Sequence, residues 1–260
     1  MDAVYIPFEV PPERLKSVFR SMKASGVSGI NVTIPHKQAV LRLADALSPE
    51  ARGIGAANTV VFRNGRSKAY NTDGEGFMRS LKCDLKMDPR GKSVLLLGCG
   101  GAARAIAFVL AREGAGPITF VDKIEKRARE LAAKTKKDFS RCGGTLPRCG
   151  AKHIPFLKSR IDEGVLDADL LVNASPVGMH KGDPCIVSPG ALHKGLAIYD
   201  IVYNPPATPL LREAKKRGIR ASNGLGMLLY QGVLSFELFT GIKAPVSVMR
   251  SALMRAVKKC

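Results

Sequence analysis

The chain has 260 residues, of which 45% are hydrophobic and 24% are charged, a composition typical of a soluble globular protein large enough for two domains. Its 41 basic and 22 acidic residues give a formal net charge of +19. The basic residues are spread along the chain or lie near the ends of predicted helices, where cations complement the helix dipole. Because only 6% of the residues are aromatic and Trp is absent, a base-stacking surface is not indicated, and we expect no nucleic-acid partner.

The sequence contains no apolar run of membrane-spanning length and no charged start followed by an apolar core. We therefore expect no membrane anchor, no secretory signal and a cytoplasmic location. The six cysteines match no zinc spacing, so reduced thiols are expected, with a local bridge between Cys142 and Cys149 as the alternative under oxidising conditions. The four histidines show no ligand spacing, and no metal is predicted.

The first part of the chain is predicted to form a small α/β layer. Its expected elements are a strand over residues 4–10, a helix over 13–23, a strand over 29–34, a helix over 38–47 that ends at Ser48-Pro49, and strands over 58–63 and 67–71. The turn Asn64-Gly65 between the last two strands is the strongest short signal for a hairpin.

A second alternation of strands and helices follows a connecting helix over residues 73–81. We predict strands over 94–97, 118–121, 170–173, 197–202 and 219–221, a weak strand within 138–156, and helices over 102–112, 125–136, 227–239 and 246–257. Strands that alternate with helices indicate a doubly wound parallel sheet.

A glycine-rich turn follows the strand over 94–97 and opens the next helix. Gly98, Gly100 and Ala103 occupy the three positions of the dinucleotide fingerprint, with Gly101 and Ala102 between them. Glycines let the backbone approach a pyrophosphate, and the helix N-terminus supplies free N–H donors. This context favours dinucleotide binding over a turn that merely packs a helix on a strand.

The acidic residue at the end of the following strand, Asp122, completes the fingerprint and bears on the choice of cofactor. A carboxylate there accepts hydrogen bonds from the ribose hydroxyls of NAD and repels the extra phosphate of NADP. Lys123, Lys126 and Arg127 follow at once and could neutralise that phosphate. The sequence therefore leaves NADP or NAD open, with a lean to NAD.

Two residues are candidates for acid–base chemistry. The strand that contains Val32 must end at Pro35, which places Lys37 where open α/β folds build ligand clefts and where a lysine can exchange protons near neutral pH. Asp73 follows the hairpin at the start of a helix, as an N-cap or as a carboxylate that orients an amine and accepts a substrate hydroxyl. For Lys37 the alternative is an ordinary surface lysine.

Six motifs come in the order found in shikimate dehydrogenases, and the chain resembles that family over almost its whole length. The motifs are N-V-T-I-P-H-K (31–37), A-N-T-V (57–60), Y-N-T-D-G (70–74), G-C-G-G-A (98–102), N-A-S-P-V-G-M (173–179) and N-G-L-G-M-L-L-Y-Q (223–231). The family reduces 3-dehydroshikimate to shikimate with a nicotinamide cofactor in the chorismate pathway to aromatic amino acids.

The resemblance implies roles for individual residues. Lys37 would pass a proton to the carbonyl oxygen, and Asp73 would hold a substrate hydroxyl and orient the lysine. The implied substrate-holding residues are Thr33, Asn58, Tyr203 and Gln231. The implied cofactor-binding residues are Gly98, Gly100, Gly101, Ala102, Asp122, Lys123, Arg127, Ile201 and Gly224.

The chain departs from the family pattern at two places. The family normally opens with a strand and a helix that carry a Ser-x-Ser motif for the substrate carboxylate, and no such motif precedes Asn31. We therefore expect the first domain to lack that strand and helix, through a misplaced start, a truncated chain or a degenerate homologue. NADP-using members usually have Asn-Arg-Thr where this chain has Asp122-Lys123-Ile124, which resembles members that act on quinate or shikimate with NAD.

We predict a two-domain α/β dehydrogenase, either a monomer or a homodimer. A small N-terminal α/β substrate domain comprises residues 1–80 plus 241–260, and a Rossmann-type domain with a doubly wound parallel sheet comprises 81–240, with nicotinamide and substrate meeting in the cleft between them. The expected activity is NAD(P)-dependent shikimate dehydrogenase. The alternatives are an NAD-dependent quinate/shikimate dehydrogenase and a truncated non-catalytic homologue that binds a nucleotide or another anion.

Overall fold

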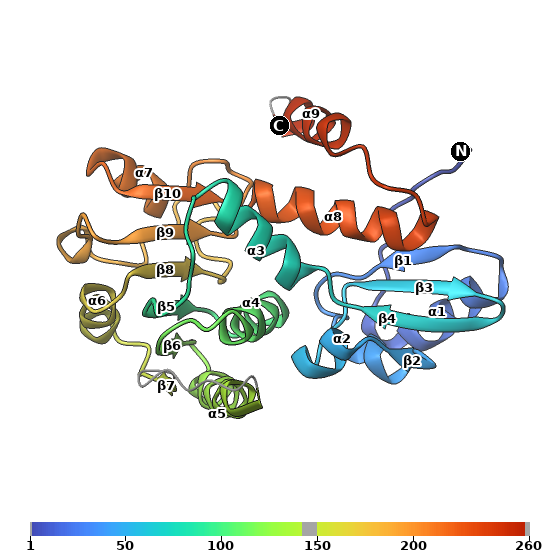
Figure 1. Ribbon diagram of the computed structural model, residues 1–260, viewed down its shortest axis with the longest axis horizontal. Helices are drawn as coiled ribbons and strands as arrows, with labels where there is room; N and C mark the ends of the chain where they lie inside the picture. The colour runs from blue at the N-terminus through green and yellow to red at the C-terminus, as the bar shows by residue number, and fades with distance from the viewer. Residues whose placement is uncertain (1, 142–149, 258–260) are drawn as a thin grey trace. The chain divides into compact units, whose positions relative to one another are not determined.

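The computed structural model describes residues 2–141 and 150–257 and divides the chain into two compact units, Met1–Asn71 and Thr72–Cys260 (Figure 1). The boundary between the units lies before Asp73, so residues 72–80 and the helix α9 (Val246–Val257) group with the second unit, whereas the sequence analysis placed them with the first. The bridge considered for Cys142 and Cys149 lies outside the described residues. Cys83, Cys99 and Cys185 are free thiols.

The first unit contains a four-stranded mixed sheet with the strand order β1-β3-β4-β2. Its strands are β1 (Gly29–Asn31), β2 (Ala46–Leu47), β3 (Thr59–Arg63) and β4 (Arg66–Tyr70). Neighbouring strands in the series β1, β3, β4 are antiparallel, whereas β2 runs parallel to β4. The predicted hairpin is confirmed, because Asn64 and Gly65 have φ values of 50° and 70°, as a type I′ turn requires.

One face of this sheet is covered by helices and carries the core of the first unit. The helical segments are η1 (Pro12–Arg14), α1 (Leu15–Ala24), η2 (Ala39–Arg42) and α2 (Pro49–Ile54). Phe19 of α1 packs edge-to-face on Phe62 of β3, with ring centroids 5.3 Å apart. Val40 and Ala51 bring η2 and α2 into the same buried cluster. The predicted helix over 13–23 is confirmed by η1 and α1.

Three predictions for the first unit are wrong. Residues 4–10 form no strand, because Pro7 in their centre has no N–H to donate to a ladder. Strand β1 stops at Asn31 rather than at Ile34. The predicted helix over 38–47 is replaced by η2 and β2. Ser48-Pro49 begins a helix instead of ending one, since Ala51 N donates to Ser48 Oγ at 3.1 Å and Pro49 occupies the first turn of α2.

The second unit contains a six-stranded parallel sheet with the order β10-β9-β8-β5-β6-β7, which is the Rossmann order (Figure 1). Its strands are β5 (Val94–Leu97), β6 (Ile118–Val121), β7 (Ala151–His153), β8 (Leu170–Asn173), β9 (Ala197–Asp200) and β10 (Arg220–Asn223). The doubly wound parallel sheet is therefore confirmed. β7 confirms the weak strand expected within 138–156, and β9 ends two residues before the predicted end.

Helices cover both faces of this sheet. The helical segments are α3 (Asp73–Cys83), α4 (Gly101–Arg112), α5 (Glu125–Arg141), α6 (Lys158–Leu166), η3 (Pro189–Ala191), α7 (Pro209–Lys216) and α8 (Leu225–Thr240), and α9 follows them. Val94 and Leu96 of β5 face α3, α4, α5 and α8, while Leu95 and Leu97 face α6 and α7. The sequence analysis gave no bounds for helices α6 and α7. Helix α9 packs on α8 through Met249 and other apolar residues, which is why it belongs to the second unit.

Helices α3 and α8 approach each other closely because glycines lie where they meet. A Cβ on Gly226 would collide with Ser80 Oγ and Asp84 Oδ2, so no side chain fits there. Ser80 itself accepts a hydrogen bond from the buried Tyr199 hydroxyl at 2.7 Å and donates to Asp84 Oδ2 at 2.6 Å. This chain of hydrogen bonds ties β9 to α3 at the point where α8 begins.

A buried carboxyl joins the loops that follow β8 and β9. Asp200, which is completely shielded from solvent, accepts hydrogen bonds from Asn173 Nδ2 at 2.9 Å, Val202 N at 3.1 Å and Thr208 Oγ1 at 2.7 Å. Asn173 also donates to Val177 O at 3.0 Å. These bonds fix both loops to the carboxyl edge of the sheet. Burial raises the pKa of Asp200 to about 6, although the three donated hydrogen bonds oppose that shift.

Replacing Asp200 by Asn tests this network through its pH dependence. The folded protein holds the Asp200 proton more tightly than the unfolded chain, so the carboxyl's contribution to stability is present below about pH 4 and is lost as the pH rises through about 6. We expect the free energy of unfolding of Asp200→Asn, relative to the original protein, to rise by about 2–3 kcal/mol from pH 4 to pH 7 in urea titrations.

The matched control is Asp183→Asn, because the pKa of the Asp183 carboxyl is shifted in the opposite direction from that of Asp200. Backbone N–H groups of His180 and Gly178 lower the pKa of Asp183, so its contribution to stability is lost only as the pH falls below about 4, and the relative stability of this variant should change little between pH 4 and pH 7. A stability difference for Asp200→Asn that stays constant across this pH range would contradict the raised pKa.

Candidate active site

Lys37 lies in a turn of the first unit whose backbone is fixed to the segment that contains Asn58. The Lys37 carbonyl oxygen accepts a hydrogen bond from Ala57 N at 2.7 Å, and Val32 N donates to Asn58 O at 2.7 Å. Within the turn, His36 N donates to Thr33 O at 2.8 Å. Lys37 is half-buried, and Thr33 is exposed. The structure thus brings the predicted residues Thr33, Lys37 and Asn58 into one connected set of loops.

The side chains around Asn58 are held by further polar contacts. Asn58 is buried, its Oδ1 accepts a hydrogen bond from Thr59 Oγ1 at 3.2 Å, and its carbonyl oxygen accepts one from Asn31 Nδ2 at 3.2 Å. His36 Nε2 lies 2.6 Å from Val10 O. His36 therefore fastens the chain that precedes α1.

Asp73 is the first residue of α3 in the second unit, and it is only 4% exposed. A negative charge at this end of a helix is favoured by the helix dipole. One turn further along α3, a Cβ on Gly76 would lie 2.8 Å from Gln231 N and 3.0 Å from Gln231 Cβ. Thr72 Oγ1 lies 3.3 Å from Ser235 Oγ of α8. The structure thus places Gln231 beside the first turn of α3, which carries Asp73.

The glycine-rich turn joins β5 to α4 as predicted. Gly98 has a φ of 91°, and a Cβ there would lie 2.7 Å from Ala174 O, so the turn packs directly on the loop after β8. Gly100 is the N-cap of α4, and a Cβ there would meet nothing within 4 Å. Gly101 and Ala102 form the first turn of α4, where backbone N–H groups lack partners within the helix.

Asp122, directly after β6, accepts hydrogen bonds with both carboxylate oxygens. Cys99 N donates to Oδ2 and Ile124 N donates to Oδ1, each at 2.8 Å. Asp122 therefore fastens the glycine-rich turn to the end of β6. Burial, reinforced by the charge of Asp122, raises the pKa of the Cys99 thiol to about 12, so Cys99 supplies no thiolate. The Lys123 ammonium lies 5.9 Å from the centre of the Phe156 ring.

The remaining predicted residues of the second unit lie at or near the same carboxyl edge of the sheet. Ile201 follows β9, and its N–H donates to Asn173 O at 2.9 Å. Gly224 follows β10, and a Cβ on it would collide with Ile201 O. Tyr203 is exposed just beyond Ile201, and Arg127 is exposed in the first turns of α5.

Three polar residues of the second unit were given no individual role in the sequence analysis, although Asn173 opens one of the quoted motifs. Asn173 and Asp200 are the final residues of buried strands, and a polar residue at the end of an apolar run is the signal that could have identified them. The Nε atom of Arg104, in the second turn of α4, is buried and has no hydrogen-bond partner within residues 2–141 and 150–257. A buried donor of this kind is unusual, and it lies on the helix that follows the glycine-rich turn.

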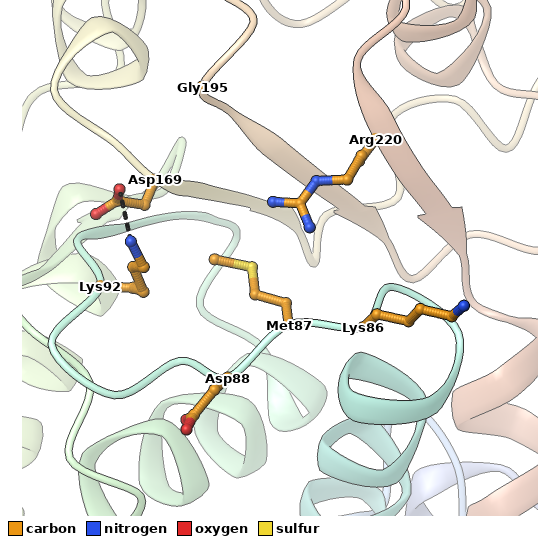
Figure 2. Close-up of a pocket in the computed structure, with 7 residues that line it drawn as sticks. All are labelled: Lys86, Met87, Asp88, Lys92, Asp169, Gly195 and Arg220. Atoms are coloured by element: carbon orange, nitrogen blue, oxygen red, sulfur yellow. Dashed lines mark ion pairs between the residues drawn. The ribbon is translucent and has the colours of Figure 1, made fainter.

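A cavity of about 280 Å³ lies at the opposite edge of the sheet, where the strands begin (Figure 2). Its lining residues are Lys86, Met87, Asp88, Lys92, Asp169, Gly195 and Arg220. Lys92 Nζ lies 3.5 Å from Asp169 Oδ1, so two of the charged side chains that line the cavity form an ion pair with each other. None of the predicted site residues lines this cavity.

Residues 2–141 and 150–257 lack two further features. No helix in these ranges combines the length and the apolar character needed to cross a bilayer. No group of three His, Cys, Asp or Glu side chains in them is arranged to hold a metal ion.

Comparisons with known proteins agree with this geometry. The sequence profile of the shikimate dehydrogenase substrate binding domain matches residues 1–60, and that of the shikimate 5′-dehydrogenase C-terminal domain matches residues 224–254. A protein of Methanopyrus kandleri named shikimate dehydrogenase (NADP(+)) is 45% identical over 260 residues, which is 99% of this chain and 87% of that protein.

Solved structures show the same relationship. A shikimate dehydrogenase in complex with NADP+ has a TM-score of 0.85 and 33% identity, and the match covers 96% of this chain and 84% of that one. A quinate dehydrogenase from Corynebacterium glutamicum in complex with NAD has a TM-score of 0.84 and 32% identity, with coverage of 93% and 82%. The profiles, the full-length identity and the shared fold together establish that this chain belongs to the shikimate dehydrogenase family.

Proposed function

We propose that this protein is a shikimate dehydrogenase, which reduces 3-dehydroshikimate reversibly to shikimate with NADP or NAD. The observation that carries this proposal is the 45% identity across nearly the whole chain to a protein named for that activity. Six motifs of the family are present in order, from N-V-T-I-P-H-K (31–37) to N-G-L-G-M-L-L-Y-Q (223–231), whereas its Ser-x-Ser and Asn-Arg-Thr motifs are not. Spectrophotometry of reduced nicotinamide formed from shikimate with either cofactor tests the proposal, and no turnover with shikimate or quinate would contradict it.

The residues of the second unit fit a nicotinamide dinucleotide. The open space at Gly100 would let a diphosphate approach the backbone, and the N–H groups at the start of α4 would hold it. The buried Nε of Arg104, without a partner in the described ranges, suits an anionic ligand that arrives from outside the chain. Asp122 would bind the ribose hydroxyls, and we propose Lys123, Arg127, Ile201 and Gly224 as further cofactor contacts.

The chemistry at the reacting carbon requires one acid and one orienting carboxylate. A nicotinamide held by the second unit would supply the hydride for the carbonyl carbon, or accept it in the reverse direction. We propose that the Lys37 ammonium donates a proton to the carbonyl oxygen as negative charge develops there, which leaves a neutral amine and a hydroxyl. Asp73 would accept a hydrogen bond from a neighbouring substrate hydroxyl and orient the substrate against Lys37.

Four further residues are proposed to hold the substrate ring. Thr33 and Tyr203 offer hydroxyls, while Asn58 and Gln231 offer amides, and both groups can donate to and accept from ring hydroxyls. Support comes from their positions: Asn58 is fixed in the loops around Lys37, and Gln231 lies beside the first turn of α3.

Lys37→Ala should lower kcat by about a hundredfold or more, because the developing oxyanion loses its proton donor. The dissociation constant of the reduced cofactor, measured by fluorescence titration, should stay within about twofold of the original value, since cofactor contacts are untouched. Lys16→Ala is the control, because it removes an exposed lysine from α1 of the same unit. Equal rates for Lys37→Ala and Lys16→Ala would remove Lys37 from its proposed role.

Asp122→Asn should shift the cofactor preference. Removing the carboxylate charge relieves repulsion of the NADP phosphate, so we expect the ratio of kcat/KM for NADP to that for NAD to rise about tenfold or more. Glu125→Gln removes a nearby exposed carboxylate whose oxygens do not hold the glycine-rich turn, and it should leave the ratio within about twofold. A fall in the ratio for Asp122→Asn would overturn this assignment.

A quinate dehydrogenase is the second candidate, because the similar structure from Corynebacterium glutamicum bears that name and contains NAD. The ratio of kcat/KM on shikimate and quinate decides between the two. A non-catalytic anion-binding homologue would instead show no turnover and binding that weakens steeply with salt.

We further propose that the enzyme acts in the cytoplasm as a monomer or homodimer without a nucleic-acid or membrane partner. The free thiols of Cys83, Cys99 and Cys185 support a reducing compartment. Sedimentation equilibrium of the purified chain would measure its oligomeric state.

A further inference from the structure

Helix α3 is packed tightly on two sides within four residues of its start. On the side of α8, a Cβ added to Gly76 would lie 2.8 Å from Gln231 N, 3.0 Å from Gln231 Cβ and 3.0 Å from Met227 O. Two of these three atoms belong to the α8 backbone and cannot rotate away. Any side chain at position 76 would therefore force the two helices apart locally.

On the side of α4, Gly74 makes a similar close approach. A Cβ on Gly74 would lie 2.6 Å from Val109 Cγ1 and 3.1 Å from Ala105 O. Asp73 stands next to Gly74, and α4 is the helix that begins at the glycine-rich turn. The position of Asp73 is thus set by contact with α4 on one side and with α8 on the other.

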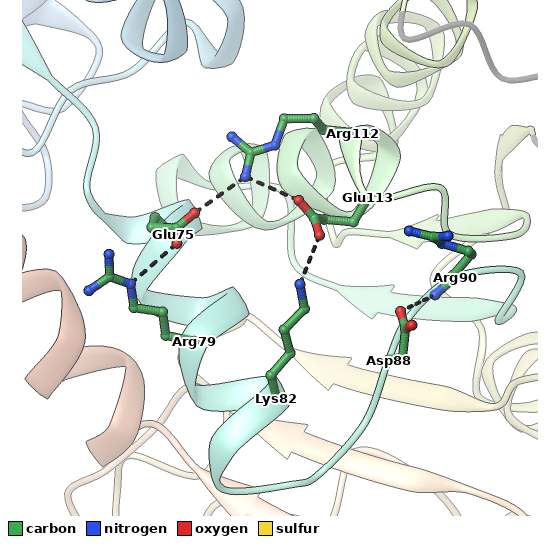
Figure 3. Close-up of polar contacts among 7 residues, drawn as sticks. All are labelled: Glu75, Arg79, Lys82, Asp88, Arg90, Arg112 and Glu113. Carbon is green, nitrogen blue, oxygen red and sulfur yellow. Dashed lines mark hydrogen bonds and ion pairs between the residues drawn. The ribbon is translucent and has the colours of Figure 1, made fainter.

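Ion pairs on the solvent side also hold α3 against α4 (Figure 3). Arg112 Nη2 at the end of α4 lies 3.3 Å from Glu75 Oε2, and Lys82 Nζ lies 2.9 Å from Glu113 Oε2. Exposed pairs of this kind contribute little singly, but they add to the packing at Gly74. With α3 held against α4 in this way, extra volume at position 76 would increase the distance between α3 and α8, and with it the distance between Asp73 and Gln231.

We propose that Gly76 is a positioning residue for the reaction: its missing side chain sets the spacing at which Asp73 and Gln231 hold one substrate molecule. This inference rests on the proposed function, because it takes Asp73 and Gln231 as substrate contacts. Interactions with a bound substrate require a fit within fractions of an ångström, and a misplacement of about 1 Å can lower turnover by about a hundredfold. Substrate recognition thus depends on a position that itself offers no hydrogen-bonding group.

The test is Gly76→Ala in the full chain, with Gly232→Ala as the matched control. Gly232 is the neighbour of Gln231 on α8, and a Cβ there would meet only Met249 Cε, at 3.8 Å. Both variants replace a helical glycine by alanine, so both gain helix propensity equally. We expect Gly76→Ala to raise the KM for shikimate about tenfold or more and to leave the dissociation constant of the cofactor within about twofold. Gly232→Ala should leave both within about twofold.

Three outcomes would overturn the inference. One is a folded Gly76→Ala protein, judged by circular dichroism, whose KM for shikimate stays within about twofold of the original. Another is a rise in KM and in the cofactor dissociation constant by the same factor, which would indicate general disturbance. The third comes from Gln231→Asn, which keeps the helix spacing and withdraws the amide by one methylene; an unchanged KM would show that this spacing does not matter.

Gln231→Asn also keeps the inference testable if Gly76→Ala does not fold. Turnover of shikimate by the original protein is measured first. Its absence would count against the proposed function, whereas turnover combined with an insensitive position 76 would count against the spacing alone.

Discussion

The alignment of five parallel strands in one register is the constraint on which the second unit depends. Leu97 of β5 pairs with Val121 of β6 and with Asn173 of β8, Asn173 pairs with Asp200 of β9, and Asp200 pairs with Asn223 of β10. These are the last residues of their strands, so every following loop begins at the same edge. A one-residue slip of β5, β6, β8 or β9 would turn its buried side chains to the other face, which the two apolar cores forbid.

That common edge explains why residues far apart in sequence act together. The strand order changes direction between β5 and β8, and Gly98 packs on Ala174 O at this point. On the β9 side, the buried carboxyl of Asp200 joins the next two loops through Asn173 and Thr208. Gly98, Asp200 and Asn173 thus fix the loops relative to one another, as backbone hydrogen bonds fix the strands.

Sequence reasoning succeeded where a local pattern was sufficient. Strands β5, β6 and β8 and helix α9 have the predicted bounds, because each is an apolar run or an amphipathic stretch with clear neighbours. It failed over 38–47, where tertiary contacts override a helical pattern. There Asp45 Oδ2 accepts hydrogen bonds from Ser67 N at 2.6 Å and Ser67 Oγ at 2.7 Å, which draws the chain alongside β4.

In the candidate site, too, some residues are evident from a local sequence pattern and others only from tertiary contacts. Lys37, Asp73 and the glycine-rich turn stand out in sequence because each follows a strand or opens a helix. Gly76 and Arg104 do not stand out, because their importance depends on contacts with distant parts of the chain. Gly76 lies against Gln231 of α8. The Nε of Arg104 is buried and has no hydrogen-bond partner in residues 2–141 and 150–257. A pattern within one segment cannot report contacts between segments.

Asp122, which we propose as a cofactor contact, also has a structural role. Two backbone N–H groups occupy one acceptor site on each of its carboxylate oxygens, while an ionised carboxylate offers about four such sites. The remaining sites could accept ribose hydroxyls without releasing the glycine-rich turn. A phosphate offers only acceptors, so beside this carboxylate it would depend on nearby cations such as Lys123 and Arg127. On this proposal, the choice of cofactor depends on the balance between the Asp122 carboxylate and these nearby cations.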